Sequence, residues 1–332
     1  MFKDQVILVT GGTGSWGHEL VKQLLEQSPR EIRIFSRGEL AQVNMEREFN
    51  DVRLKFIIGD IRDGARILEA TKGVDYVFHL AALKHVPICE LQPYEAIKTN
   101  IIGTENLIRA CISNKVKKVI DVSTDKAVDA LNLYGMSKAV GERLIIQANL
   151  LSDYTRFVCI RGGNVLGSNG SVVPFFINQI QKQNQVTITD KNMTRYFITL
   201  SEAITLLFKA SEFSKGGEVF LMRMPAYRIM DVAQVLIEDS GKKDVEIKEI
   251  GMRPGEKIDE VLVSEYEARN TYKYDDTYYV IMPSIHIPGL KEYYDEQNLE
   301  KVNFTRYTSG DVILSKNEVK TLLNKGHYLK NV

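Results

Sequence analysis

The sequence predicts a doubly wound α/β fold, in which a parallel sheet carries helices on both faces. Short apolar runs alternate with stretches of helical periodicity from residue 6 to about residue 161, and a glycine-rich turn follows the first apolar run. After about Asn164 this alternation becomes less regular. We therefore expect a larger sheet domain over residues 1–165, to which residues 194–224 return, and a smaller C-terminal α/β domain over 166–332.

The composition excludes several classes of protein. Lys and Arg together number 43 and so do Asp and Glu, which gives a net charge of zero with no long block of like charge. This balance argues against a nucleic-acid or membrane-surface partner. Cys89, Cys111 and Cys159 form no Cys-x-x-Cys pair and fit a reducing compartment. Because no apolar run approaches about 20 residues and no signal peptide is evident, we expect a soluble, cytoplasmic protein.

The first expected strand, Val6–Thr10, runs into a turn with the sequence GGTGSWG. Its glycines at positions 11, 14 and 17 allow a tight turn, close approach of a pyrophosphate and close packing of the next helix. Between a strand and a helix, this pattern indicates a dinucleotide-binding domain of the Rossmann type. The cofactor contacts expected from the turn are Gly11, Thr13, Gly14, Ser15, Trp16 and Gly17.

The second and third expected strands carry the adenosine side of the site. Strand 32–35 ends next to Ser36 and Arg37. An NAD site usually has a carboxylate here for the ribose diol, whereas a small hydroxyl followed by an arginine suits a 2′-phosphate. This pair favours NADP; the alternative is that Arg37 only faces solvent. Strand 56–60 would place Asp60 and the following Ile61 beside the adenine.

The fourth expected strand, 74–80, runs into Ala81 and Ala82, whose small side chains would let a cofactor lie against the backbone. Lys84 and His85 follow. They would contact phosphate or sugar hydroxyls, or they are polar loop residues. A helix is expected over 97–111, and its Asn100 would support a cofactor loop or have a purely structural role.

Residues 123–138, STDKAVDALNLYGMSK, contain two candidate catalytic groups. The first is Thr124–Lys126, directly after a buried strand expected over 119–122, where open α/β sheets bind their ligands. The carboxyl group of Asp125 and the amine of Lys126 could act as a separate acid and base. The alternative is a solvated turn in which Asp125 caps a helix.

The second group is Tyr134 and Lys138, which lie four residues apart and share one face of the helix expected from Leu133 onward. Free tyrosine has a pKa of about 10, so a tyrosine base that works near neutral pH needs a stabilised phenolate. A lysine cation within a few Å and a nicotinamide cation could supply this stabilisation. The spacing alone is weak, because it also occurs by chance on amphipathic helices.

Two polar segments stand out in the C-terminal half. A loop expected at 167–171 precedes the apolar residues 172–176 and a polar helix. The segment 252–257, MRPGEK, could offer Arg253 to a diphosphate and Glu256 to a ribose diol, or it forms a surface hairpin with a salt bridge. The tyrosine-rich chain from 266 onward is expected to form edge strands or subunit contacts.

Together these stretches resemble the extended short-chain dehydrogenase/reductases and, more narrowly, the inverting UDP-N-acetylglucosamine 4,6-dehydratases of bacterial surface-sugar pathways. The matching segments lie in order between residues 10 and 260: TGGTGSWG, FSRGEL, EFND, GDIRD, HLAALKHVPICE, KTNIIGTENLI, STDKAV, NLYGMSK, GNVLGSNGSVVPFF, ITDKNMTRYFIT and GMRPGEKIDE. The resemblance implies NADP as cofactor, UDP-N-acetylglucosamine as substrate, no metal ion, and a first step toward pseudaminic acid or a related sugar. It also implies a homo-oligomer, a dimer or a hexamer, without the membrane anchor of some relatives.

The resemblance implies a role for each catalytic residue. Tyr134 would take the proton of the C4 hydroxyl while hydride passes to NADP, and Lys138 would lower the pKa of Tyr134 and hold the ribose. Thr124 would hydrogen-bond the C4 oxygen. Lys126 would remove the C5 proton and Asp125 would protonate the departing C6 hydroxyl; hydride then returns to C6, and C5 is reprotonated from the opposite face. The implied substrate contacts are Lys84, His85, Asn164, Val172, Thr189, Met193, Arg195, Arg253 and Glu256.

This mechanism makes one demand that the sequence leaves open. Asp125 must be protonated, although a free aspartate titrates at about 3.9 and a neighbouring Lys126 cation would lower that pKa further. Either burial or side chains that point apart must outweigh this effect. The chain also departs from the family pattern at four positions, namely Ala41, Gly162, Asn169 and Asp259. Ala41 leaves the NADP preference mostly to Arg37, and Asn169 stands where an arginine commonly contacts phosphate.

Two other functions compete with the dehydratase. A UDP-sugar 4-epimerase has the same fold and the same Tyr–Lys pair, but such enzymes generally place a small hydroxyl residue and apolar neighbours where Asp125 and Lys126 stand. A non-catalytic NADP-binding regulator would lack at least one chemical group. Here all five candidates are present: Thr124, Asp125, Lys126, Tyr134 and Lys138.

Overall fold

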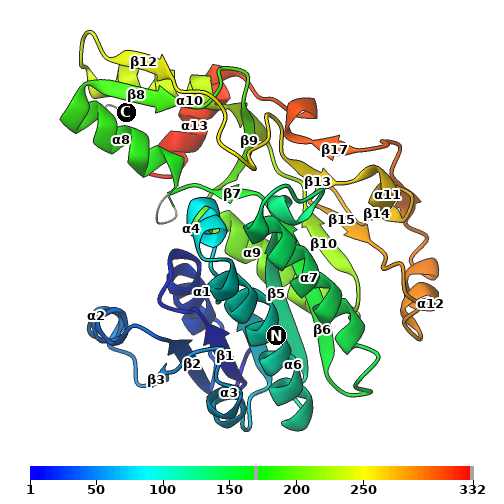
Figure 1. The fold of residues 1–332 in the computed structure, drawn as a ribbon. Helices are drawn as coiled ribbons and strands as arrows, with labels where there is room; N and C mark the ends of the chain where they lie inside the picture. The colour runs from blue at the N-terminus through cyan, green and yellow to red at the C-terminus, as the bar shows by residue number, and fades with distance from the viewer. Residues whose placement is uncertain (168–170, 330–332) are drawn as a thin grey trace.

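The computed structural model describes residues 1–167 and 171–329, so residues 168–170 of the predicted loop, including Asn169, lie outside the described part. The fold is built around a ten-stranded sheet with the strand order β16-β14-β15-β10-β6-β5-β4-β1-β2-β3 (Figure 1). Neighbouring strands are parallel from β3 to β10. Their bounds are β1 (Val6–Thr10), β2 (Glu31–Ser36), β3 (Leu54–Ile58), β4 (Tyr76–His79), β5 (Lys118–Thr124), β6 (Arg156–Gly162) and β10 (Val219–Met222).

This strand order confirms the doubly wound fold. The order runs outward in both directions from the neighbouring strands β1 and β4, and ligands of such sheets bind beyond the carboxyl ends of the strands at this reversal. The central strands are buried on both faces, as parallel strands are; in β1 the side chains of Ile7, Leu8 and Val9 are fully buried.

Helices cover both faces of the large sheet (Figure 1). One layer consists of α3 (Gly64–Ala70), α6 (Gly103–Ser113) and α7 (Leu133–Ala148), and the opposite layer contains α1 (Ser15–Glu26) and α9 (Leu200–Phe213). Helix α2 (Glu39–Phe49) packs along β2 and β3. Helix α7, which carries the predicted Tyr–Lys pair, begins where the Asn132 side chain accepts a hydrogen bond from the backbone N–H of Gly135 at 2.8 Å.

Three antiparallel strands extend the sheet beyond β10. They are β15 (Tyr278–Ile281), β14 (Thr271–Lys273) and β16 (Glu300–Lys301). The tyrosine-rich chain from 266 onward thus forms strands at the edge of the sheet. Helix α9 packs on the large sheet and β10 joins it, whereas β9 (Thr194–Ile198) pairs elsewhere. The division into two domains, with residues 194–224 assigned to the first, stays a prediction.

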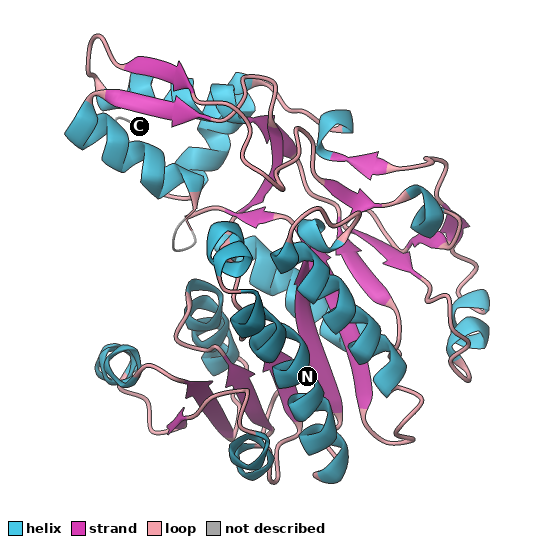
Figure 2. Ribbon diagram, in the orientation of Figure 1, coloured by secondary structure: helices cyan, strands magenta, loops and turns pink. Residues whose placement is uncertain are grey.

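A second apolar core lies apart from the large sheet (Figure 2). It is formed mainly by α8 (Val172–Gln183), α10 (Ile229–Ser240) and α13 (Lys316–Lys325) against the parallel pair β8 (Gln185–Ile188) and β12 (Glu246–Glu249). A three-stranded sheet of β7 (Asn164–Val165), β9 and β11 (Ala226–Arg228) lies between the two cores. The remaining elements include the pair β13 (Val261–Val263) and β17 (Tyr307–Thr308), the short helices α4 (Val86–Leu91), α5 (Pro93–Ile97), α11 (Glu265–Ala268) and α12 (Leu290–Asp295), and 3-10 turns at Asp125–Ala127 and Ser309–Asp311.

Some local expectations differ from the structure. The helix expected over 97–111 is interrupted by a π-helical turn at Lys98–Ile102, and only then continues as α6. Such turns often occur at functional sites; this one contains Asn100. Strand β3 ends at Ile58, two residues before Asp60, so Asp60 lies in the following turn. Across the described residues, no helix is both long and apolar enough to cross a membrane.

Candidate active site

The glycine-rich turn after β1 is packed so closely that side chains would not fit. Gly11 has φ +68°, and a Cβ atom there would lie 2.9 Å from the backbone N and Cα of Ala81, at the end of β4. A Cβ on Gly17 would lie 2.3 Å from the carbonyl oxygen of Gly12. The turn therefore lies directly against the loop after β4 and leads into the N-terminus of α1, the kind of helix end that binds phosphate groups. Thr13, Gly14, Ser15 and Trp16 occupy this turn and the first turn of α1.

Gly11→Ala is expected to weaken cofactor binding by about tenfold or more, because alanine is strained by about 1–2 kcal/mol at this φ and would also clash with Ala81. Gly73→Ala is the matched control: Gly73 has φ +67°, but nothing lies within 4 Å of its added Cβ. Titration of NADP into both variants measures the difference. Equal affinity in the two variants would contradict the close approach described here.

On the adenosine side, Ser36 ends β2 and its hydroxyl accepts a hydrogen bond from Nε2 of Gln42 at 2.9 Å. Arg37 is exposed. The carboxylate of Asp60 is held by the guanidinium of Arg62, with Nε–Oδ distances of 2.9 and 3.0 Å, and this hydrogen bonding lowers the pKa of Asp60. Ile61 is buried next to it. Asp60 is therefore an ionised, fixed acceptor, and Arg37 is a cation at the surface of the same edge.

Asn100 holds the loop after β4, and its role toward a cofactor stays a prediction. Its Oδ1 accepts from the backbone N–H of Leu83 at 2.8 Å, and its Nδ2 donates to the carbonyl of Leu83 at 2.9 Å and to Oγ of Ser137 at 2.9 Å. Ser137 lies on α7 between the candidate pair Tyr134 and Lys138. The π-helical turn thus connects the loop that contains Ala81 and Ala82 with α7. Lys84 and His85 follow on the surface of the loop.

The Lys138 ammonium has a buried partner that the sequence analysis missed. Its Nζ lies 3.3 Å from both carboxylate oxygens of Asp121, which is fully buried in β5. Burial would lower the pKa of Lys138, but Asp121, together with Tyr134 and Cys159, outweighs burial and the pKa is raised. His79 lies 4.0 Å from Asp121, and burial lowers the pKa of His79 to about 4, so its imidazole is neutral. Asp121 was not singled out from the sequence, because it lies within an apolar run that indicated only a buried strand.

The phenol of Tyr134 is less acidic in this structure than the sequence analysis expected. Burial raises its pKa above the ordinary value, and it outweighs the lowering by Lys138, by Lys126 and by a hydrogen bond with Thr124. The expected contribution of Lys138 is present, but it is not sufficient by itself. A positive charge of a bound nicotinamide ring would act in the same direction as Lys138.

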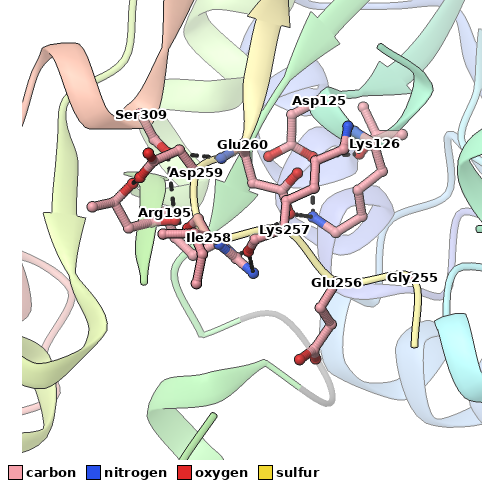
Figure 3. Close-up of polar contacts among 12 residues, drawn as sticks. Asp125, Lys126, Arg195, Gly255, Glu256, Lys257, Ile258, Asp259, Glu260 and Ser309 are labelled. Atoms are coloured by element: carbon pink, nitrogen blue, oxygen red, sulfur yellow. Dashed lines mark hydrogen bonds and ion pairs between the residues drawn. The ribbon is translucent and has the colours of Figure 1, made fainter. Parts of the chain in front are cut away.

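The first candidate group, Thr124–Lys126, lies where β5 ends, and Figure 3 shows its Asp125 and Lys126. Thr124 is the last residue of β5, and its hydroxyl donates to Oδ1 of Asp125 at 2.9 Å. Asp125 is fully buried, and Nζ of Lys126 lies 3.1 Å from the same Oδ1. On its other side, Nζ lies 3.1 Å from Oε1 of Glu260, a buried residue just before β13. Arg195 in β9 approaches Glu260 with an Nε–Oε1 distance of 3.5 Å.

These contacts answer the question that the sequence left open for Asp125. The side chains of Asp125 and Lys126 do not point apart. Burial raises the pKa of Asp125, and the negative charge of Glu260 raises it further. These two effects outweigh the lowering by Lys126. For Lys126, burial would lower the pKa, but Asp125 and Glu260 outweigh it and raise it. The structure therefore favours a protonated Asp125 more than a free aspartate does, and it stabilises Lys126 as an ammonium.

A cavity of about 490 Å³ adjoins this group. The predicted residues that line it are Lys126, Asn164, Arg195, Arg253 and Glu256, and the other lining residues are Val86, Pro87, Glu90, Leu91, Asn132, Pro254, Gly255, Lys257 and Glu260. Its polar lining combines cations with carboxylates, which suits a ligand that carries both a phosphate and hydroxyl groups. Lys257 and Glu260 were not singled out from the sequence, although both belong to the segment GMRPGEKIDE.

Other predicted substrate contacts lie outside the cavity lining. Val172 is the first residue of α8, Thr189 follows β8, and the side chain of Met193 is buried in the second apolar core. Lys84 and His85 precede α4, whose residues Val86 and Pro87 line the cavity. Their predicted roles stay predictions.

Comparison with known proteins places these features in a family. A family model described as "Polysaccharide biosynthesis protein" matches residues 7–282. The chain is 44% identical to the UDP-N-acetylglucosamine 4,6-dehydratase (inverting) of Campylobacter jejuni subsp. jejuni serotype O:2, over 86% of this chain and 85% of that protein. It is 42% identical to the UDP-glucose 4-epimerase of Rickettsia akari, over 99% and 98% of the two chains. The X-ray structure of Pen from Bacillus thuringiensis superposes with a TM-score of 0.90 at 38% identity, covering 98% of this chain and 99% of that one.

Proposed function

Because the chain belongs to the polysaccharide biosynthesis protein family, we propose that it is an NADP-dependent hydro-lyase that removes water across C5 and C6 of UDP-N-acetylglucosamine and inverts C5. The product would be UDP-2-acetamido-2,6-dideoxy-β-L-arabino-hex-4-ulose, an early intermediate toward pseudaminic acid or a related surface sugar. The dehydratase relative, similar over most of both chains, supports the reaction class.

One observation carries this proposal. Asp125 and Lys126, an acid and a base in contact, lie beside a cavity large enough for a sugar nucleotide and next to the helix of Tyr134 and Lys138. An enzyme that only oxidises and reduces C4 has no use for a buried carboxyl group whose pKa is raised. A dehydratase needs such a group, because the C6 hydroxyl leaves as water only after it receives a proton.

The cofactor part of the proposal rests on the turn after β1. The close approach of Gly11 to Ala81, and of Gly17 to Gly12, leaves room for a dinucleotide to lie against the backbone. Gly11, Thr13, Gly14, Ser15, Trp16 and Gly17 would hold the pyrophosphate, and Lys138 with Tyr134 would hold the nicotinamide ribose. Arg37 next to Ser36 supports NADP over NAD, since a guanidinium binds a phosphate in a bidentate manner.

Arg37→Ala is expected to lower the affinity for NADP by about tenfold, the loss of one charge-assisted contact, and to leave the affinity for NAD nearly unchanged. Arg30→Ala is the control, because Arg30 is also exposed but precedes β2 at the opposite end of the sheet. Titration of both cofactors into both variants checks this. Equal losses for NAD and NADP would contradict the assignment of Arg37 to the 2′-phosphate.

In the proposed mechanism Tyr134, Lys126 and Asp125 each move one proton. Tyr134 takes the proton of the C4 hydroxyl, and Thr124 hydrogen-bonds the C4 oxygen. NADP, held by the turn after β1, Tyr134 and Lys138, would supply hydride-accepting and hydride-donating chemistry, so the overall reaction would be redox-neutral. The C4 ketone acidifies the C5 proton, which Lys126 removes as a neutral amine. Asp125 protonates the C6 hydroxyl, which leaves as water, and C5 is finally reprotonated from the opposite face.

The proposal extends to the assembly and the location of the protein. We propose a cytoplasmic location and a homo-oligomer, a dimer or a hexamer. The oligomer is supported by apolar side chains that are exposed on α7 and on the adjoining π-helical turn. Met136 and Val140 lie four residues apart on one face of α7 and are 48% and 43% exposed, and Ile102 is 44% exposed.

The direct test incubates the purified protein with NADP and UDP-N-acetylglucosamine and follows the sugar nucleotide by mass spectrometry. The proposal predicts a product that has lost one water molecule, with no net consumption of NADP. The alternative is a UDP-sugar 4-epimerase, which the relative in Rickettsia akari supports. It predicts a product of unchanged mass with altered configuration at C4, and that result would replace the dehydratase.

A further inference from the structure

We infer that Glu260 is a positioning residue for the proposed base: it holds the Lys126 side chain against Asp125 and opposes loss of the ammonium proton. The inference deepens the proposed dehydration and takes its mechanistic meaning from it. The ion pair between Lys126 and Glu260, on which the inference rests, can be measured whether or not the protein dehydrates the substrate.

Glu260 is fixed from both its backbone and its side chain (Figure 3). Its backbone N–H donates to Oγ of Ser309 at 2.9 Å, and its carbonyl accepts from the backbone N–H of Ser309 at 2.9 Å. Ser309 is fully buried, so this pairing sets the position of Glu260 with little freedom. The carboxylate then extends to Nζ of Lys126 at 3.1 Å. Lys126 is thus held between two carboxylates that approach it from β5 and from the chain before β13.

More than one cation lies beside Glu260. Arg195, whose guanidinium donates to the carbonyls of Thr194, Lys257 and Ile258, adds a second cation. Lys257 is a third cation that acts on Glu260. Moving one proton from Nζ of Lys126 to Oδ1 of Asp125 along their 3.1 Å hydrogen bond breaks one N–H bond and forms one O–H bond, with no change in net charge. That transfer produces the neutral amine and the protonated carboxyl group that the proposed elimination requires.

Glu260 favours the ammonium form of Lys126, whereas Arg195 opposes it. The charge of Glu260 also raises the pKa of Asp125, so it favours the protonated form of both partners. Within the described part of the chain, Oδ2 of Asp125 and Oε2 of Glu260 are buried without a hydrogen-bond partner. A buried polar atom without a hydrogen-bond partner costs about 1–3 kcal/mol of stability. An ion pair with a purely structural role would bear this cost for each of the two oxygens. The other titratable or charged groups that face the cluster are Tyr134 from α7, Tyr196 from β9 and Lys257 from the loop before β13.

The test measures when the Lys126 amine becomes a free base. Competitive acetylation over a range of pH, read by peptide mass spectrometry, gives a titration curve for each lysine. In the wild type, Lys126 should titrate at higher pH than Lys257, whose pKa is lowered by burial. In Glu260→Gln, the curve of Lys126 should move to lower pH, with acetylation about tenfold faster at a fixed pH below the wild-type midpoint, since one opposite charge is lost. An unchanged curve would overturn the inference.

Two further variants keep this result interpretable. Glu256→Gln removes another carboxylate from the same cavity without an ion pair to Lys126, and should leave the curve of Lys126 in place. Arg195→Gln should move the curve in the opposite direction, to higher pH, because it removes a neighbouring cation. If Glu260→Gln does not fold, the acetylation curve of Lys126 in Arg195→Gln is the test instead. A shift of that curve to lower pH would overturn the inference.

The activity of Glu260→Gln separates this inference from the proposed function. If Lys126 is the base, the low-pH limb of the kcat profile should move to lower pH, and Glu260→Asp, which restores the charge, should move it back. An acetylation shift in a protein that releases no water from the substrate would contradict the proposed function and support the role of Glu260. Normal dehydration with the low-pH limb of kcat unmoved in Glu260→Gln would overturn that role.

Discussion

Tyr134→Phe is expected to lower kcat by about 10²–10⁴, because the variant keeps the ring but loses the group that takes the C4 hydroxyl proton. Oxidation at C4 comes first in the proposed sequence, so neither the dehydrated product nor a reduced nicotinamide should accumulate. Single-turnover absorbance of the cofactor, together with mass spectrometry of the sugar, measures both. Since burial raises the pKa of Tyr134, the oxidation step of the wild type should accelerate as the pH rises through neutrality.

Tyr76→Phe is the matched control for this variant. Tyr76 begins β4, at the end of the sheet opposite the cavity, and its ring packs edge-on against Phe2. Loss of its hydroxyl should leave kcat unchanged. A Tyr134→Phe variant that still oxidises the substrate at the wild-type rate would remove Tyr134 from the mechanism.

Lys126→Met should have two large effects. Without the proposed base, dehydration should fall by about 10²–10⁴, while Tyr134 still allows oxidation, so reduced nicotinamide should accumulate with the 4-keto sugar. The variant also leaves Asp125 and Glu260 as neighbouring buried carboxylates without the cation between them. We expect a loss of about 3 kcal/mol in the free energy of unfolding at neutral pH, the lower end of the range for a broken buried pair, because Lys126 is 23% exposed.

The pH dependence of this loss has a definite sign. Removal of Lys126 takes away the charge that lowers the pKa of Asp125, so the folded-state pKa lies further above the unfolded value of about 3.9. A raised folded-state pKa favours folding when the group is protonated, so the variant should regain stability as the pH falls toward the unfolded value. Denaturant unfolding at several pH values measures this. A stability deficit that is constant with pH would contradict the burial of an unpaired Asp125.

Lys257→Met is the control for the stability effect. Lys257 lines the same cavity, and its Nζ donates to the carbonyl of Val128 at 2.6 Å rather than to a carboxylate. Its loss should leave the Asp125–Lys126–Glu260 contacts in place and cost little stability. An equal loss in both variants would mean that any lysine of the cavity is needed for folding.

Features set by local sequence could be predicted well. The alternation of apolar runs gave the doubly wound sheet, and the spacing of Tyr134 and Lys138 placed both on one face of a helix that begins at Leu133, as the structure shows. The glycine turn after Val6–Thr10 was also predictable, because the need for glycine at positions 11 and 17 is a matter of backbone geometry.

Features that depend on distant contacts could not be predicted in this way. Asp121 lies within an apolar run, and only the packing of α7 onto β5 makes it the partner of Lys138. Glu260 belongs to a motif that was recognised, but its approach to Lys126 depends on how the chain before β13 returns to the end of β5. The direction of the pKa shift of Asp125 is likewise a sum of burial and opposing charges, which neighbouring residues in the sequence do not reveal.

The most direct measurement of the central claim is the reaction of UDP-N-acetylglucosamine in deuterated water, followed by NMR. If Lys126 removes the C5 proton and the opposite face is reprotonated, the product has lost one water molecule, carries deuterium at C5 and has the L configuration there. A sugar nucleotide epimerised at C4, with its water retained and no deuterium at C5, would contradict the proposed function and the assignment of Asp125 and Lys126 as acid and base.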